Sequence, residues 1–231
     1  YGKDYLYYLC TSPWGVWRYL KNERWEKNMT DYKKLSENTF NMQAKTYDTD
    51  KNGKHARNLY QDIINTLAAL RFSSVLDVGC GTGEILSAIR KRYPTASLCG
   101  IDISQEMLKQ AEEKRMANVK LYLGDAEHLP FENAEFDVLI CTDSFHHYPE
   151  PQRAIEEFYR VLQKDGYLLL ADFVKPFPVR QLMNIFLPFS SEGDVKIYSR
   201  REIISFLRQN GFRDIQYQKI NKSSYLTVAK K

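Results

Sequence analysis

The sequence lacks several features that mark other classes of protein. Its four cysteines, Cys10, Cys80, Cys99 and Cys141, include no C-x-x-C pair. We therefore expect neither a disulfide framework nor a zinc site, and the pattern fits a reducing cytoplasm. No apolar run is long enough to cross a membrane. The first residues also lack a basic stretch followed by an apolar one, so no signal peptide is predicted.

The sequence also lacks a large excess of charge of either sign. The formal net charge is +4, and the Lys and Arg residues are interspersed with Asp and Glu. Proteins that bind nucleic acid usually gather positive charge into a stripe, so nucleic acid is not an expected partner. With 43% hydrophobic and 27% charged residues in 231, the chain has the balance of a globular domain with a full core. That length fits one α/β domain with additions.

Residues 1–40 differ from the rest of the chain. They hold all three tryptophans, Trp14, Trp17 and Trp25, and many of the tyrosines. We predict a helical extension that packs on the main domain or on a second subunit, which would make a homodimer. A membrane-surface helix is the alternative, because aromatic residues beside basic ones suit an interface. Interspersed glutamates weaken that alternative.

Beyond the extension, helix and strand patterns alternate. Short apolar runs predict buried strands at residues 75–78, 98–101, 120–123, 138–141 and 167–171. Helices are expected to begin near Ser104, a typical N-cap residue, and at Pro151. The turn residues Asp165 and Gly166 precede the last of these strands. Continuous apolar strands that alternate with helices predict an α/β fold with a parallel, doubly wound sheet.

The C-terminal part breaks this alternation. A capping box of Ser199 and Glu202 predicts the start of a helix that ends at Gly211. Two strand patterns follow, at residues 215–220 and 225–228, with no helix between them. Because consecutive strands with a short connection pair antiparallel, we expect a hairpin at the sheet edge.

The strongest chemical signal is a loop between a predicted strand and a helix, with glycine at positions Gly79, Gly81 and Gly83. Glycine lets the backbone turn sharply and lets a ligand lie against bare main chain. A dinucleotide fingerprint would need another glycine where Glu84 stands, and a carboxylate there would repel a pyrophosphate. The loop therefore suits a ligand without phosphates. A tight strand–helix turn that binds nothing is the alternative.

Three further signals lie at the ends of the following strands. Asp102 stands about 20 residues beyond the loop, where nucleotide-binding folds place the acid that holds ribose, although a helix cap is also consistent. Asp125 follows the third strand, and its side chain would accept from an adenine amine or form an Asx-turn. Residues 141–148 follow the fourth strand, at the switch point where open α/β sheets bind ligands.

Together these segments resemble the ordered motifs of class I S-adenosylmethionine (SAM)-dependent methyltransferases. The matching stretches are residues 77–83, 100–104, 125–131 and 144–148. The chain is most similar to the small-molecule branch that includes the ubiquinone and menaquinone C-methyltransferases. The resemblance implies a Rossmann-like seven-stranded sheet in residues 41–231, ordered 3-2-1-4-5-7-6 with strand 7 antiparallel and helices on both faces. It also implies methyl transfer from SAM to a small molecule, with S-adenosylhomocysteine as product.

The resemblance assigns the glycine loop to the cofactor. Gly79, Cys80, Gly81 and Gly83 would face the methionine and ribose parts of SAM, and Asp77 would support the amino group, through water if not directly.

It also assigns the two strand ends that follow. Asp102 would hold the ribose hydroxyls, Ile103 and Met107 would pack on the adenine, and Asp125 and Ala126 would read its edge. Met107 at helical spacing is equally consistent with plain core.

The implied reaction needs little from the protein beyond positioning. A sulfonium is an activated leaving group, so the main task is to hold nucleophile, methyl carbon and sulfur in line and to exclude water. A general base is needed only if the nucleophile starts protonated. His146, His147 and Tyr47 are the candidates, and a packing role is open for each. The Cys141 carbonyl would accept from the SAM amino group, and no metal is expected.

The acceptor is expected to be apolar or aromatic. The insertion at residues 173–198 is rich in apolar and aromatic side chains and is interrupted by three prolines. It predicts a short helix and loops that form a lid over the crevice, or that only pack on the domain. Two alternatives to a methyltransferase stay open: a SAM-binding regulatory protein without transfer, and an NAD-dependent oxidoreductase. Glu84 argues against the second.

Overall fold

The computed structural model describes residues 32–51, 53–190 and 192–231. The predictions for the tryptophan-rich part of the extension, and for a homodimer formed through it, lie outside these residues. Residues 32–43 are helical, which agrees with the predicted helical character of the extension at its C-terminal end.

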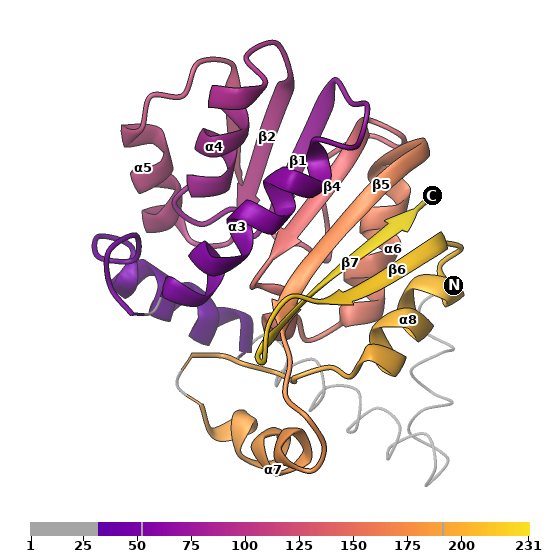
Figure 1. Ribbon diagram of the computed structural model, residues 1–231. Helices are drawn as coiled ribbons and strands as arrows, with labels where there is room; N and C mark the ends of the chain where they lie inside the picture. Colours follow the sequence, from indigo (N-terminus) through magenta and orange to yellow (C-terminus); the bar gives the residue numbers. More distant parts are fainter. Residues whose placement is uncertain (1–31, 52, 191) are drawn as a thin grey trace, which may run out of the picture.

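Seven strands form a single sheet in the order β3-β2-β1-β4-β5-β7-β6 (Figure 1). The strands are β1 (Ser74–Val78), β2 (Ser97–Asp102), β3 (Val119–Leu123), β4 (Phe136–Thr142), β5 (Leu162–Phe173), β6 (Arg213–Lys219) and β7 (Ser224–Lys230). Strands β1 to β5 pair in parallel, whereas β7 runs antiparallel to both β5 and β6. The predicted strand order and the predicted terminal hairpin are both confirmed.

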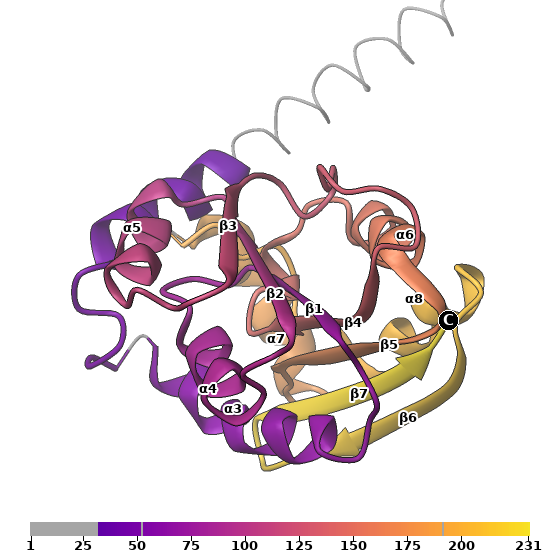
Figure 2. The ribbon, with the colours of Figure 1, turned by 90° about the horizontal axis from the view of Figure 1, so that it is seen from above.

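Helices cover both faces of the sheet, as predicted (Figure 2). The first group is α3 (Lys54–Leu67), α4 (Glu84–Arg92) and α5 (Gln105–Glu113), and the second is α6 (Pro151–Val161) and α8 (Arg200–Gln209). Each group buries its own apolar cluster against the strands. Leu59 and Leu86 belong to the first cluster, and Phe158 and Leu207 to the second. Two-sided burial explains why the parallel strands are continuously apolar.

Local signals in the sequence set the helix ends. The Ser104 side chain accepts a hydrogen bond from the Met107 N–H at 3.1 Å and caps α5. Ser199 and Glu202 form both bonds of the predicted capping box. Gly211 follows α8 with a φ of +90°, a conformation that favours glycine. These three predictions are confirmed.

The start of β5 differs from the prediction. The strand begins at Leu162, directly after α6, instead of at residue 167. Leu162 pairs with Phe136, and the register shifts before Val138. Asp165 takes a φ of +65° within the strand. Residues 163–166, which include the Asp165-Gly166 signal, therefore form an irregularity inside a longer strand, and the continuous pairing with β4 begins at Tyr167 as predicted.

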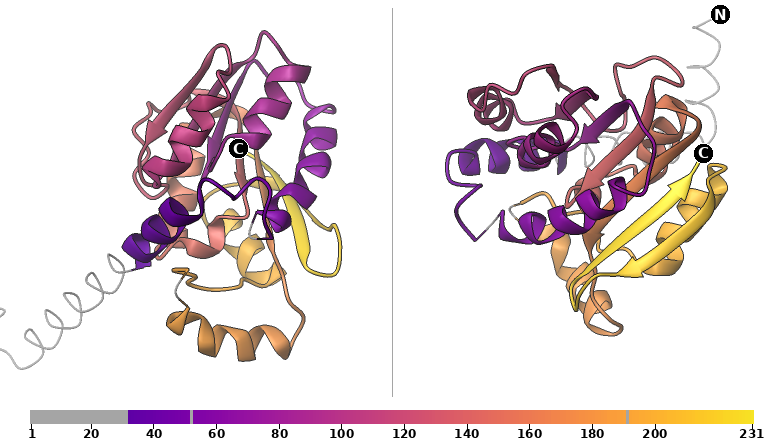
Figure 3. Two further views of the ribbon diagram at one scale, coloured as in Figure 1. Left: turned by 90° about the vertical axis from the view of Figure 1, so that its left-hand side faces the viewer. Right: turned by 45° about the horizontal axis from the view of Figure 1, so that its top comes forward.

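The insertion at residues 173–198 forms a short helix with loops, as predicted. It contains α7 (Val179–Phe186) and the 3-10 turn η2 (Leu187–Phe189). Helix α7 projects from the main body beyond the carboxyl ends of the parallel strands (Figures 1 and 3). None of the described helices is long and apolar enough to cross a bilayer.

Candidate active site

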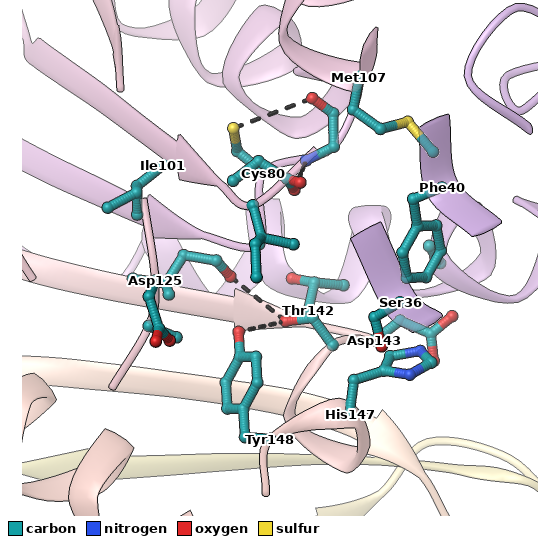
Figure 4. A pocket seen from close by; sticks show the side chains of 18 of the residues that line it. Ser36, Phe40, Cys80, Ile101, Met107, Asp125, Thr142, Asp143, His147 and Tyr148 are labelled. Atoms are coloured by element: carbon teal, nitrogen blue, oxygen red, sulfur yellow. Dashed lines mark hydrogen bonds between the residues drawn. The ribbon is translucent and has the colours of Figure 1, made fainter. Parts of the chain in front are cut away.

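A cleft of about 850 Å³ opens at the carboxyl ends of β1, β2 and β4. Its walls come from the glycine loop, the residues after each strand and the helix at residues 32–43. Figure 4 shows Asp125, Thr142 and Phe40 around the same hollow. This is the switch point of the sheet, where β1 is flanked by β2 on one side and β4 on the other.

The glycine loop forms the floor of this cleft. Gly79 and Gly81 have φ values of +72° and +52°, which disfavour other residues. A Cβ at Gly79 would stand 2.4 Å from Ser144 Oγ, whereas a Cβ at Gly81 would meet nothing within 4 Å. The backbone at Gly81 is thus bare toward the cleft. Gly83 lies outside the cleft lining and packs on α5, where its Cβ would stand 3.0 Å from Ala111 Cβ.

Asp102 lies where the ribose prediction requires it. Its two carboxylate oxygens accept hydrogen bonds from the Gly81 and Ser104 N–H groups, each at 2.8 Å. Burial raises the pKa of Asp102, and these backbone bonds oppose that rise. Each oxygen keeps a second lone pair, so the carboxylate can accept from a ligand hydroxyl while the loop holds it in place.

Asp77 is placed differently from the prediction's simplest form. It is 1% exposed, is not part of the cleft lining, and neither carboxylate oxygen has a hydrogen-bond partner among the described residues. Burial, with a smaller effect from Asp102, raises its pKa to about 8. A carboxyl of this kind is largely protonated at neutral pH, and a nearby ammonium group would lower its pKa and favour the carboxylate.

Asp125 forms the Asx-turn that was one of its two predicted roles, and it also pairs with Lys33, a contact that was not predicted. One oxygen accepts from the Glu127 N–H at 2.9 Å, as in an Asx-turn, and the other accepts from Lys33 Nζ at 2.6 Å. Burial acts to raise the pKa of Asp125, but the hydrogen bonds from Lys33 and the Glu127 N–H, together with the charge of Lys33, outweigh it and the pKa falls. Lys33 also pairs with the buried Glu127. The helix at residues 32–43 is thereby joined to the wall of the cleft.

Tyr47 lies where the cofactor cleft meets a second cleft, and its neighbour Asp48 is bonded to the glycine loop. Asp48 accepts from the Thr82 hydroxyl and from Lys114 Nζ, the latter at 2.7 Å. Lys114 also pairs with Glu84 at 2.6 Å. Burial raises the pKa of the Tyr47 phenol, so this side chain stays protonated and donates a hydrogen bond more readily than it removes a proton.

The second cleft, of about 830 Å³, borders the first. The two share Phe40, Tyr47, Asp143 and His147. The remaining walls combine four apolar side chains with five polar or ionisable ones: Phe173, Met183, Leu187 and Ile197, and Gln43, His55, His146, Glu192 and Asp194. A ligand here would lie end to end with a ligand in the cofactor cleft, across the four shared residues.

His146 and His147 differ sharply in charge although they are adjacent. The ring of His146 contacts Asp172, with Nδ1 2.6 Å from Oδ1. Burial acts to lower its pKa, but the charge of Asp172 raises it to about 10. For His147, burial and the neighbouring His146 lower the pKa to about 4. His146 is therefore an imidazolium at neutral pH, and His147 is a neutral ring.

His147 has a free acceptor toward the junction of the clefts. Its Nδ1 is buried without a hydrogen-bond partner among the described residues, and the nearest carboxylate oxygen, on Asp194, lies 3.6 Å away. The Asp194 backbone region is held in place because the Val195 N–H donates to the His146 carbonyl at 2.9 Å. A ligand hydroxyl could donate to this nitrogen.

A second hydrogen-bonded chain fixes Asp143. His55 Nδ1 lies 2.6 Å from Asp143 Oδ1, and its Nε2 lies 2.9 Å from Ser224 Oγ. Ser224 is fully buried, so this Ser–His–Asp chain offers no exposed nucleophile. It orients the Asp143 carboxylate, whose backbone φ of +52° is uncommon for a residue with a side chain, at the border of the two clefts.

Two sets of side chains have the composition of a metal site. One is His146, His147 and Asp194, and the other is Asp143, His146 and Asp172; within each, the ligand atoms lie within 4.8 Å of one another. Both sets need His146, so they cannot form independently. The short contact of His146 with Asp172 accounts for one of its ring nitrogens with a proton in place of a metal.

The cleft brings together eight of the predicted cofactor residues: Gly79, Cys80, Gly81, Asp102, Ile103, Met107, Asp125 and Ala126. Asp77, Gly83 and Cys141 lie outside its lining. Cys141 is fully buried, and its thiol faces Ser144 Oγ at 3.3 Å, while Thr142 lines the cleft in its place.

Several residues of the site were missed in the sequence. Lys33, Ser36 and Phe40 come from the extension, and Asp194 comes from the insertion. None of the four belongs to a recognised motif, so the sequence offered no reason to select them. Asp172 could have been predicted, because it follows a predicted strand at its carboxyl end, as Asp102 does.

Residues 76–170 match the family model described as a methyltransferase domain. The chain is 32% identical over 157 residues to 2-methyl-6-phytyl-1,4-hydroquinone methyltransferase 2 of Oryza sativa, across 67% of this chain and 43% of the rice protein. It is 30% identical over 187 residues to the ubiquinone/menaquinone biosynthesis C-methyltransferase of Campylobacter jejuni, across 68% of this chain and 78% of that protein.

Among solved structures, a Haemonchus contortus phosphoethanolamine N-methyltransferase in complex with SAM has the same fold. Its TM-score is 0.67 at 17% identity, with 75% of this chain and 52% of that chain covered. The sheet order, the glycine loop and the matches to known families thus identify the chain as a class I SAM-dependent methyltransferase. Within that class, the chain belongs to the small-molecule family of the ubiquinone/menaquinone C-methyltransferases.

Proposed function

We propose that this chain transfers the methyl group of SAM to a hydroxylated aromatic ring with an apolar substituent. The observation that carries this proposal is the meeting of two clefts at Phe40, Tyr47, Asp143 and His147. One cleft has the family's cofactor loop, and the other combines apolar side chains, such as Phe173, Met183 and Leu187, with a cluster of polar and ionisable ones. Two relatives, those of rice and Campylobacter, are named for hydroquinone or quinone methylation.

The residues present fit SAM in the first cleft. The bare backbone at Gly81 leaves room for the ligand, Asp102 has free lone pairs for two hydroxyls, and Ile103 and Met107 supply an apolar wall. When bound, SAM supplies a methyl group on a positively charged sulfur. Glu84, which pairs with Lys114, stands where a dinucleotide loop needs glycine. The NAD-dependent alternative is therefore disfavoured.

His146 is proposed to activate the acceptor electrostatically. Its imidazolium lies in the second cleft, where it would stabilise the negative charge of a phenolate. A phenolate is a better nucleophile than a phenol, at oxygen or at a ring carbon. Because the methyl donor is already activated, lowering the pKa of the acceptor is the main chemical help the protein can add.

His147 is proposed to receive the acceptor's hydrogen bond. The neutral ring offers its unpartnered Nδ1 at the border of the clefts. With a pKa of about 4, it is a weak base, so it orients the hydroxyl, while the charge of His146 lowers the pKa of that hydroxyl and its proton passes to solvent water. Tyr47, protonated and at the same border, would position the acceptor or cover the cofactor.

The place of the reaction and the oligomeric state are further parts of the proposal. Buried free thiols at Cys80, Cys99 and Cys141 are consistent with a reducing compartment such as the cytoplasm. A homodimer through the extension and a lid function for residues 173–198 also remain proposals. So does the role of each site residue named above.

Single-turnover transfer from methyl-labelled SAM to a panel of methyl acceptors tests this function. The panel contains hydroquinones and catechols with and without a prenyl chain, together with amines. Label recovered in a hydroquinone or catechol supports the proposal. SAM binding without label transfer to any acceptor supports the SAM-binding protein without transferase activity. Label in the amines alone would refute the aromatic acceptor.

A further inference from the structure

Helix α7 is amphipathic, and its apolar face points toward solvent. None of its residues is buried. Leu182, Ile185 and Phe186 follow the i, i+3, i+4 spacing of one helical face and are 60, 63 and 62% exposed, and Phe189, in the turn η2 that follows, is 85% exposed. Phe177, 75% exposed, precedes the helix. Isolated exposed apolar residues are ordinary, but a continuous stripe of large ones marks an interaction surface.

This orientation is fixed by specific contacts with the protein. The Asn184 side chain makes two hydrogen bonds with the backbone of Ile197, donating to its carbonyl at 3.1 Å and accepting from its N–H at 2.9 Å. Met183 and Leu187, on the same side, line the second cleft. Rotating the helix to bury its apolar stripe would break these bonds. The stripe is therefore held outward.

The charges next to the stripe are positive. Lys175 and Arg180 flank Phe177, and neither makes a salt bridge with any of the residues that the structure describes. Lys175 Nζ lies 4.7 Å from the centre of the Phe173 ring. Large apolar side chains beside unpaired cations are what an interfacial helix uses: the apolar stripe enters the acyl boundary, and the cations meet anionic headgroups.

We propose that the α7 stripe, with Phe177, Lys175 and Arg180, docks on the surface of an anionic lipid bilayer. The occupant is the bilayer itself, because cations border the stripe and because the same helix forms a wall of the acceptor cleft. An apolar acceptor dissolved in the membrane would pass along α7 into that cleft. This last step rests on the proposed function, whereas membrane docking does not.

Vesicle flotation with the full chain tests the docking. The vesicles contain phosphatidylglycerol and phosphatidylcholine, or phosphatidylcholine alone. Wild-type protein should float with the anionic vesicles, and less at high salt because the Debye length shortens. The double variant Leu182→Ser/Phe186→Ser should lose at least tenfold in partitioning, and Lys175→Glu/Arg180→Glu should lose binding to the anionic vesicles specifically.

The matched control is Leu123→Ser, on the opposite edge of the sheet, where Leu123 is 58% exposed. It should float like wild type. Thermal shifts with SAM show that each variant is folded. Failure of the wild type to float, or flotation of the double variant at the wild-type level, would overturn the proposal. A wild-type dimer that becomes a monomer in the double variant, without flotation of either, would instead make the stripe an interface between copies and also overturn it.

Two acceptors separate this inference from the proposed function. A hydroquinone with a long prenyl chain is embedded in vesicles, and one without a chain is dissolved in buffer. The double variant should slow methylation of the embedded acceptor at least tenfold and leave the dissolved one within twofold. Equal loss on both would refute delivery from the membrane. If wild type methylates neither but still floats, the proposed acceptor fails and the docking stands.

Discussion

The two clefts of this protein are built in different ways. The cofactor cleft is formed largely by the glycine loop and by residues that directly follow strands, and the helix at residues 32–43 and α3 complete its walls. The acceptor cleft is assembled from side chains of five separate segments, including the extension and the insertion. The cofactor cleft therefore depends mostly on the sheet and its glycine loop, whereas the second cleft depends mostly on segments added to the sheet. This is why folds of this kind serve many acceptors with one methyl donor.

The largest expected effect is on the backbone of the cofactor cleft. Gly81→Val places a branched side chain at a φ of +52° and in the open space toward the ligand. We expect a loss of at least about 100-fold in SAM affinity by calorimetry, in addition to about 1–2 kcal/mol of strain.

The matched control is Gly211→Ala, at a φ of +90° after α8 and outside the cleft. It should lose stability to urea and keep SAM affinity. Normal SAM binding by folded Gly81→Val would show that the loop does not contact the cofactor.

In the acceptor cleft, the largest effect is expected from Asp172→Asn. Asp172 makes the largest contribution to keeping His146 charged, with smaller ones from Asp143 and Asp194, so its removal should let burial bring the pKa of His146 well below about 10. We expect kcat to fall by about 100-fold at neutral pH while the affinity for SAM is unchanged.

The pH profile distinguishes this effect from a purely structural one. In wild type, the active imidazolium is lost only as pH rises through about 10. In the variant, it should be lost at acidic to neutral pH, so activity should recover as the pH is lowered. A wild-type profile in a weakened variant would contradict the role given to His146.

A smaller effect is expected from Asp102→Ala. Removing the carboxylate takes away the acceptor for the ribose hydroxyls and the partner of the Gly81 and Ser104 N–H groups. SAM affinity should weaken by about 1–3 kcal/mol, as for an unpaired hydrogen-bond site. Thermal melts without ligand monitor the fold. Unchanged affinity in a folded variant would remove Asp102 from the site.

The smallest expected effect is that of a chelator. If protons and not a metal occupy the His146, His147 and Asp194 cluster, dialysis against a chelator should leave methyl transfer within about twofold. Transfer that is lost and then restored by one divalent ion would show that this cluster is a metal site, and the two histidines would need new roles.

Local features of the sequence predict the strands and helices and most residues of the cofactor cleft. Strand and helix periodicity, the caps at Ser104 and Ser199, and the glycine at alternate positions are local features, and each fixes its backbone within a few residues. Chain order then places the ends of parallel strands together. Asp102 and Gly81 meet because β1 and β2 are neighbours, in the strand order that the resemblance to the family implies.

The arrangement of the second cleft depends on contacts between distant segments, and so do the places where local sequence signals failed. Asp165 and Gly166 are residues typical of turns, yet they lie inside β5, because β5 pairs with β4 both before and after them. The difference in charge between His146 and His147 depends on Asp172, which is 26 residues away from His146 and contacts the ring of His146 at 2.6 Å. The outward apolar stripe of α7 depends on two hydrogen bonds from Asn184 to Ile197. Contacts between distant segments carry no period and no spacing, because the folded backbone alone brings their side chains together.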